Sequence, residues 1–123
     1  MANAINWFEI PAKDLDRACN FYSQVLGGDV HQQEIGGFNM GFLPMNDQEG
    51  VGGALVQGEG YEPSDSGALV YLNGGDDLSG PLNRVVSAGG SVIMPKTKIS
   101  DEIGYYALFT DTEGNKLAFH SIN

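Results

Sequence analysis

Two side chains in this sequence have the chemistry of an acid–base pair, and they lie near opposite ends of the chain. Glu9 lies in a mostly apolar segment at residues 5–10, and His120 lies in a comparable segment at residues 116–121. A carboxylate beside an imidazole can transfer a proton or hold a metal ion. If the first and last segments are neighbouring strands, Glu9 and His120 meet. The same two residues can instead form a hydrogen-bonded polar pair with only a structural role.

The remaining candidates for chemistry are weaker. His31 lies beside two glutamines with no second ligand at useful spacing, so it is interpreted as a solvated strand residue. Cys19 falls on the apolar face of a predicted helix, where packing is the expected role. The glycine-rich stretch 50–53 lacks the Gly-Lys-Ser or Gly-Lys-Thr of a phosphate loop. The polar stretch 61–65 is interpreted as a structured linker, with a ligand-contacting rim as the alternative.

The first half of the chain is predicted to contain a strand, a helix and three further strands, which would position the candidate residues in this half. Apolar residues recur every three or four positions from Leu15 to Leu26, which predicts an amphipathic helix. Asp14 can cap its first turn, and Gly27 can take the left-handed conformation after its last. The flanking segments alternate or are rich in β-formers, which predicts strands at residues 5–10, 29–35, 38–43 and 51–56.

The same order of elements is predicted again after a glycine-, proline- and serine-rich connection at residues 57–67. We expect strands at 68–72, 91–95, 105–110 and 116–121, with a helix at 78–88. Gly27 and Gly89 are 62 residues apart, and Ala54 and Ala118 are 64 apart, which indicates an internal duplication. The predicted fold class is α+β, with one domain at 1–123 built from β-α-β-β-β modules at 4–57 and 67–122.

Two stretches resemble a known family. Asp14-Leu15-Asp16-Arg17-Ala18, followed by Phe21-Tyr22 and Val25-Leu26-Gly27, is similar to the first helix of the vicinal oxygen chelate superfamily. That superfamily includes glyoxalase I, bleomycin resistance proteins and extradiol dioxygenases. The stretch Phe109 to Leu117 resembles the turn before the family's last strand. Since the two stretches lie at opposite ends, the resemblance covers nearly the whole chain. It implies two modules that form a curved mixed sheet around a cleft, and it implies a homodimer.

The resemblance also implies four metal-ligand positions, two in each module, which the family fills with His, Gln or Glu. Counted from the motifs, these positions fall on Trp7, Ala54, Leu69 and Ala118. None of these side chains offers a donor to a divalent cation. We therefore expect no metal at the usual site, no other cofactor, and no true lactoylglutathione lyase activity, although the chain resembles proteins related to that enzyme.

Two functional hypotheses follow, with a third in reserve. The first is a protein that binds a small organic ligand in the cleft, with Trp7, Leu69, Tyr71, Ala54 and Ala118 lining it. Trp7 and Tyr71 can stack on a flat ligand, although Trp7 can also simply fill the space of the absent metal. The second is a lyase, isomerase or dioxygenase-type enzyme with a displaced site at Glu9 and His120, which leaves room for a metal there. The third is a module kept for protein interaction.

The amino-acid composition limits the classes of partner that the protein is expected to bind. Sixteen acidic against six basic residues give a net charge of −10, which argues against nucleic acid and against anionic membrane surfaces. The chain shows no apolar run of membrane-spanning length and no signal-peptide pattern at its start. With a lone cysteine, these features favour a cytoplasmic protein.

Overall fold

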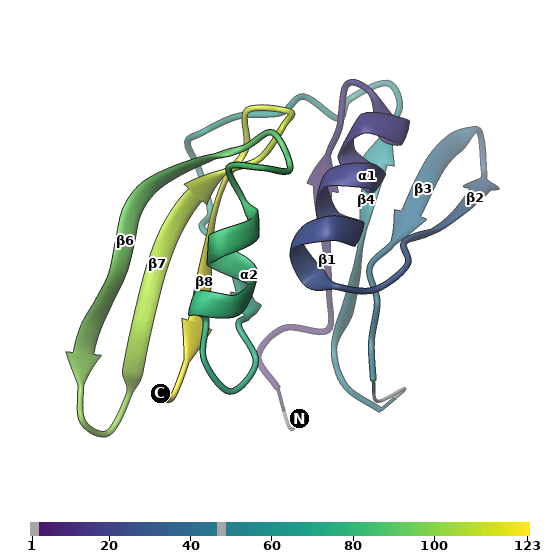
Figure 1. Ribbon diagram of the computed structural model, residues 1–123. Helices are drawn as coiled ribbons and strands as arrows, with labels where there is room; N and C mark the ends of the chain where they lie inside the picture. The colour runs from purple at the N-terminus through teal and green to yellow at the C-terminus, as the bar shows by residue number, and fades with distance from the viewer. Residues whose placement is uncertain (1–2, 47–48) are drawn as a thin grey trace.

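The computed structural model describes residues 3–46 and 49–123, and it contains two β-α-β-β-β modules. Figure 1 shows one module to either side, with the helices between and in front of the sheets. The predicted α+β fold class is confirmed. The elements of the first module are β1 (Trp7–Pro11), α1 (Leu15–Leu26), β2 (His31–Ile35), β3 (Phe38–Phe42) and β4 (Gly52–Gln57). Those of the second are β5 (Tyr71–Asn73), α2 (Ser79–Arg84), β6 (Ser91–Ser100), β7 (Gly104–Thr110) and β8 (Lys116–Ser121).

Within the described residues, the strands form two four-stranded mixed sheets with matching topology. Their orders are β1-β4-β3-β2 and β5-β8-β7-β6, so the first strand of each module pairs in parallel with the last. Glu9 lies opposite Ala54 in one sheet, and Tyr71 lies opposite Ala118 in the other. Glu9 and Tyr71 therefore occupy equivalent positions, and the register supports the predicted duplication.

Helix α1 forms because its apolar residues share one face, and that face is buried. Leu15, Ala18, Cys19, Tyr22 and Val25 are buried as the periodicity predicts, and Phe21 is fully buried as well. Asp14 accepts the backbone N–H of Arg17, and Gly27 ends the helix with φ of 70°. The predicted cap and stop are thus both present.

One hydrophobic core serves both modules. It contains α1 residues together with residues of α2, β7 and β8. The Phe21 ring of α1 stacks on Phe109 of β7 with centroids 6.2 Å apart, and Phe109 stacks on Phe119 at 4.7 Å. The helices therefore lie against the inner face of the sheets, which leaves the opposite face of each sheet free of helices.

The turn at residues 111–115 joins the second module to the start of α1. The Glu113 carboxylate accepts the backbone N–H of Asp14 at 2.8 Å and the Arg17 guanidinium at 2.7 Å. Beside it, the buried Tyr22 hydroxyl donates to Asp111 at 2.7 Å. The stretch that carries the family resemblance is therefore a joint between modules.

The second helix and strand β6 differ most in length from the prediction, and β5 covers only Tyr71–Asn73 where a strand at 68–72 was predicted. The second helix was predicted at 78–88, but α2 covers only Ser79–Arg84, and turns follow it. Gly80 and Pro81 are poor helix formers, and the Val85 N–H bonds to the Leu82 carbonyl in the tighter three-residue pattern. Strand β6 runs to Ser100 instead of ending at Pro95. It is an edge strand with register shifts, and edge positions tolerate proline.

Neither α1 nor α2, the helices of the described chain, has the length and apolar character needed to cross a membrane.

Candidate functional site

The helix-free faces of the two sheets carry the residues that the sequence singles out. Side chains alternate along a strand, so Trp7 and Glu9 share a face with Ala54 and Phe42, away from α1. In the second sheet, Tyr71 shares the corresponding face with His120 and Ala118. We call these two surfaces together the open face.

Glu9 is the centre of a hydrogen-bonded cluster in the first module. One carboxylate oxygen accepts the Trp7 indole N–H at 3.3 Å, and the other accepts the Tyr61 hydroxyl at 2.6 Å. This hydrogen bond to a carboxylate raises the pKa of Tyr61. Tyr61 belongs to the connection between modules, so that connection folds back onto the open face. Of the two interpretations of residues 61–65, the structure supports a segment that reaches the candidate site.

Aromatic rings surround this cluster. The Trp7 ring lies 6.1 Å from that of Phe42, and the Tyr61 ring contacts Phe38 edge-to-face at 5.5 Å. The Phe38 ring lies close to the backbone at residue 58, and only glycine leaves room for it there, because a Cβ on Gly58 would lie 2.2 Å from the ring. The result is a carboxylate set among four aromatic side chains.

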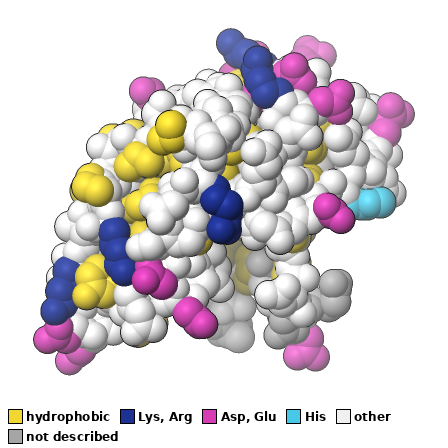
Figure 2. All heavy atoms as spheres, in the orientation of Figure 1, with side chains coloured by type: hydrophobic (Ala, Val, Ile, Leu, Met, Phe, Trp, Pro, Cys, Tyr) yellow, Lys and Arg dark blue, Asp and Glu magenta, His cyan; other side chains and the backbone are white. Residues whose placement is uncertain are grey.

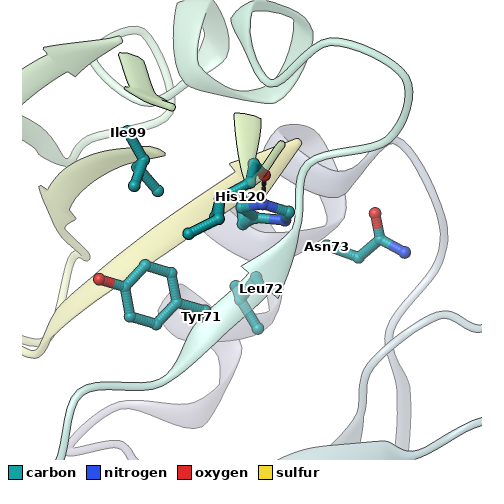
Figure 3. Close-up of a pocket in the computed structure, with 6 residues that line it drawn as sticks. Tyr71, Leu72, Asn73, Ile99 and His120 are labelled. Carbon is teal, nitrogen blue, oxygen red and sulfur yellow. Dashed lines mark hydrogen bonds between the residues drawn. The ribbon is translucent and has the colours of Figure 1, made fainter. Parts of the chain in front are cut away.

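The second module contributes a shallow, open pocket of about 530 Å³. Figure 3 shows Tyr71, Ile99 and His120 around it, and Leu72, Asn73 and Ile103 complete its lining. The Tyr71 ring lies 6.5 Å from that of Tyr106. The pocket is thus lined mainly by apolar and aromatic side chains, together with Asn73 and the imidazole of His120.

The His120 imidazole is engaged by the protein backbone. Its Nε2 lies 2.6 Å from the carbonyl oxygen of Ile103. A carbonyl oxygen only accepts, so Nε2 must carry the proton in this contact, and Nδ1 is left for another partner. The hairpin between β6 and β7 therefore orients the ring.

Glu9 and His120 lie in different sheets. Strand β8 lies between β5 and β7, whereas β1 pairs with β4 in the other sheet. Glu9 is bound by Trp7 and Tyr61, and His120 by Ile103. The assumption that the first and last strands are direct neighbours is therefore wrong. The two groups act in separate surroundings, which gives no support to a joint acid–base pair.

The predicted ligand-contacting residues differ in exposure. The exposed fractions are 43% for Trp7, 49% for Tyr71 and 36% for Leu69, whereas Ala54 and Ala118 are fully buried. In this arrangement the two alanines form the floor of the open face, beneath the larger side chains. A ligand would meet the rings first.

The donor set does not fit the divalent metal that the family resemblance implies. The four corresponding positions offer an indole, an isobutyl group and two methyl groups, which are not ligands for a divalent cation. Within residues 3–46 and 49–123, no group of three or more His, Cys, Asp or Glu side chains is placed to hold a metal.

Two other sequence candidates take no part in the contacts described above. His31 is exposed at the start of β2, where it lies opposite Phe42 at the outer edge of the open face. Cys19 is buried on α1, and burial, with a smaller effect of Asp16, raises the pKa of its thiol to about 11. Its thiol therefore stays protonated and is a poor nucleophile at neutral pH.

Some site residues were missed by sequence reasoning. Ile99 and Ile103 are absent from the predicted site because the strand predicted at 91–95 stops at Pro95, so the long hairpin that carries them is not predicted. Tyr106 lies directly opposite His120, so strand alternation and pairing contained a usable signal for it. No local pattern indicated that Tyr61 would reach Glu9, which is 52 residues away in the chain.

Comparison with known proteins gives consistent family matches. A family model described as the Glyoxalase/Bleomycin resistance protein/Dioxygenase superfamily matches residues 4–119. A glyoxylase-like domain-containing protein from Didymella fabae is 30% identical over 118 residues, which cover 90% of this chain and 88% of the relative.

Solved structures agree on the fold. A glyoxalase/bleomycin resistance protein from Albidiferax ferrireducens T118 matches with a TM-score of 0.76 at 15% identity, over 95% of this chain and 97% of that one. Glyoxalase I from Zea mays matches with a TM-score of 0.72 at 16% identity, over 94% of this chain and 43% of the maize chain. The chain therefore spans less than half of the maize enzyme, and at these identities the likeness concerns the fold alone.

Proposed function

This chain belongs to the Glyoxalase/Bleomycin resistance protein/Dioxygenase superfamily, and we propose that it binds a small organic ligand on its open face without the divalent metal of its metal-dependent relatives. The ligand contacts Trp7 in the first module and Tyr71 in the second. The proposal concerns binding, because Glu9 and His120, the two groups predicted as an acid–base pair, lie in different sheets and hydrogen-bond to other groups.

One observation carries the proposal. Two large aromatic side chains, Trp7 and Tyr71, are almost half exposed, each on the helix-free face of its own sheet, and each has a second aromatic ring beside it. Aromatic rings carry large apolar surfaces whose removal from water is favourable, at about 25 cal/mol per Å². A flat ligand gains this free energy by covering them, and the pocket beside Tyr71 supplies the concave surface.

The binding test uses the only tryptophan of the chain as its reporter. Neutral and charged planar aromatic compounds are screened for a saturable change in Trp7 emission, and Tyr71→Ala is compared with the native protein. We expect at least one compound to bind and Tyr71→Ala to weaken it. Val86→Ala is the matched control, since Val86 is 66% exposed but lies next to α2. A screen in which no compound changes the emission contradicts the proposal.

The metal-free part of the proposal has its own test. After dialysis against buffer free of added metal, elemental analysis is expected to find far less than one divalent ion per chain. The chemical reason is the absence of oxygen, nitrogen or sulfur ligands at Trp7, Ala54, Leu69 and Ala118. Near-stoichiometric zinc, nickel, iron or manganese, whose removal abolishes a measured turnover, contradicts it.

We also propose that the chain forms a homodimer in the cytoplasm. Strand β6 is a ten-residue edge strand that exposes Val92, Ile93 and Ile99. Figure 2 shows hydrophobic side chains gathered over this outer part of the second module. A long edge with exposed apolar side chains invites pairing, and a second copy would cover it. The lone, buried Cys19 suits a reducing compartment.

A further inference from the structure

We propose that Glu9, Trp7 and Tyr61 form a subsite for an organic cation, such as an ammonium group attached to an aromatic body. This inference rests on the proposed ligand binding and assigns a chemical class to the ligand. Glu9 supplies the negative charge, and the rings of Trp7 and Tyr61 supply the walls.

The charge of Glu9 is held in place but not neutralised. Its two oxygens accept from an indole N–H and a phenol O–H, both of which are uncharged donors. Among the residues that the structure describes, the ion pairs of Arg17, Lys96 and Lys98 involve other carboxylates. Glu9 is itself exposed, so a ligand can approach it from solvent.

The surrounding rings favour the same kind of ligand. The π-faces of Trp, Tyr and Phe carry partial negative charge and attract cations, with Trp the most effective. Trp7 is paired with Phe42, and Tyr61 with Phe38, so the carboxylate lies between two ring pairs. An anionic ligand would be repelled by Glu9 and would gain little from the rings.

Comparison of the two duplicated modules shows that the carboxylate of Glu9 has no equivalent in the second module. The register that sets Glu9 opposite Ala54 sets Tyr71 opposite Ala118, so a tyrosine takes the place of the carboxylate in the second module. There the neighbours are Ile99 and Ile103. The two halves of the open face therefore differ in charge, and they suit a ligand with one cationic end and one apolar end.

The net charge of the whole chain also favours a cationic ligand. At −10 the protein attracts cations from solution, and this attraction is weakened by salt.

The test compares naphthylmethylammonium with its neutral counterpart naphthylmethanol. The readout is the indole N–H resonance of Trp7 in a nitrogen-15 correlation spectrum, which reports on the atom that donates to Glu9. We expect the cation to bind roughly tenfold more tightly than the neutral compound, and added salt to reduce this ratio. In Glu9→Gln the ratio is expected to fall several-fold, and the rings and the remaining net charge should keep a smaller preference for the cation. Tyr61→Phe, which frees one carboxylate oxygen, should keep the preference for the cation.

Glu34→Gln is the matched control for charge. Glu34 is an exposed carboxylate of the same sheet, but strand alternation puts it on the opposite face from Glu9. It changes the net charge equally and should leave the ratio unchanged. Equal binding of the two naphthyl compounds, or an unchanged ratio in Glu9→Gln, overturns the cation subsite while ligand binding itself stands. If neither of these compounds nor any in the wider screen affects Trp7, the proposed function fails and the subsite fails with it.

Discussion

Glu113 shows how much structure can depend on one side chain. Its side chain is fully buried, and its two oxygens accept hydrogen bonds from backbone N–H groups of Lys13 and Asp14 and from the Arg17 guanidinium. Burial by itself would raise the pKa of Glu113, but the hydrogen bonds from Arg17, Asp14 and Thr112 outweigh it and hold the pKa below its ordinary value. The carboxylate is therefore the stable form in the folded protein.

Replacing this residue by its amide tests the joint between the modules. We expect Glu113→Gln to lower the free energy of unfolding at neutral pH by about 2 kcal/mol, because the buried donors lose part of their acceptor. Denaturant unfolding measures this difference. Glu34→Gln, an exposed change of the same charge, should have little effect.

The native protein and Glu113→Gln should also differ in how their free energies of unfolding depend on pH. A carboxyl whose folded pKa lies below its unfolded value stabilises the fold above the ordinary carboxyl range. That stabilisation is lost as the pH falls through the folded pKa. The stability difference between the native protein and Glu113→Gln should therefore shrink as the pH is lowered below about 4.5. A difference that stays constant down to strongly acid pH would show that the charge of Glu113 has no part in it.

Among the elements, α1 and α2 differ in how their ends are made. Helix α1 has a side-chain cap at Asp14 and a left-handed Gly27 at its end. In helix α2 the cap residue Leu78 makes no side-chain hydrogen bond, the neighbouring Asp77 carboxylate accepts the Ser79 N–H, and the helix ends after six residues. Arg84 of α2 instead donates to the Val25 carbonyl at the last turn of α1, so the shorter helix helps to complete the longer one.

Two glycine-to-alanine changes should therefore change the free energy of unfolding in opposite directions. Gly27→Ala forces a Cβ into the left-handed region and should cost about 1 kcal/mol of unfolding free energy. Gly80→Ala lies inside α2, where the added Cβ would be 4.0 Å from the Arg84 guanidinium, and should raise the unfolding free energy by about 0.5 kcal/mol. Thermal and denaturant unfolding of both variants measure the signs. Equal effects of the two changes would contradict the assigned cap.

At the scale of the whole molecule, the modules share a core while their sheets stay separate. We expect Phe109→Ala, in the second module, to cost about 3–5 kcal/mol because Phe109 is fully buried between rings of α1 and β8. Trp7 emission, which reports on the first module, and far-ultraviolet circular dichroism should show the same shifted transition. A Trp7 transition that stays at the native midpoint would mean that the modules unfold independently.

The proposed dimer is tested by sedimentation equilibrium. The expected mass is that of two chains of 13.1 kDa. Ile93→Lys, on the exposed edge strand β6, should favour the monomer because it places a charge in the proposed contact. Val86→Lys, beside α2, is the control for added charge and should not. A native protein that remains monomeric at high micromolar concentration excludes the dimer.

Local patterns in the sequence were enough to determine the type and order of nearly every element. Helix α1 was predicted with its cap and its stop, because the 3.6-residue periodicity, Asp14 and Gly27 are all local features. The α+β class and the repeated module followed from the order of elements. Weak local signals failed where tertiary context decides, as at the end of α2 and at Pro95 of β6.

Only the tertiary structure decided how the candidate site is assembled. The sequence correctly placed Trp7 beside Glu9 on one face of a strand, since alternation is local. It had no means to show that Tyr61 binds Glu9, or that Ile103 binds His120, because both contacts depend on how a connection or a hairpin folds back over a sheet. Nor could it show that Glu9 and His120 lie in different sheets. Which strands are neighbours is determined by long-range pairing and by the shared core, and neither is written in any short stretch of the chain.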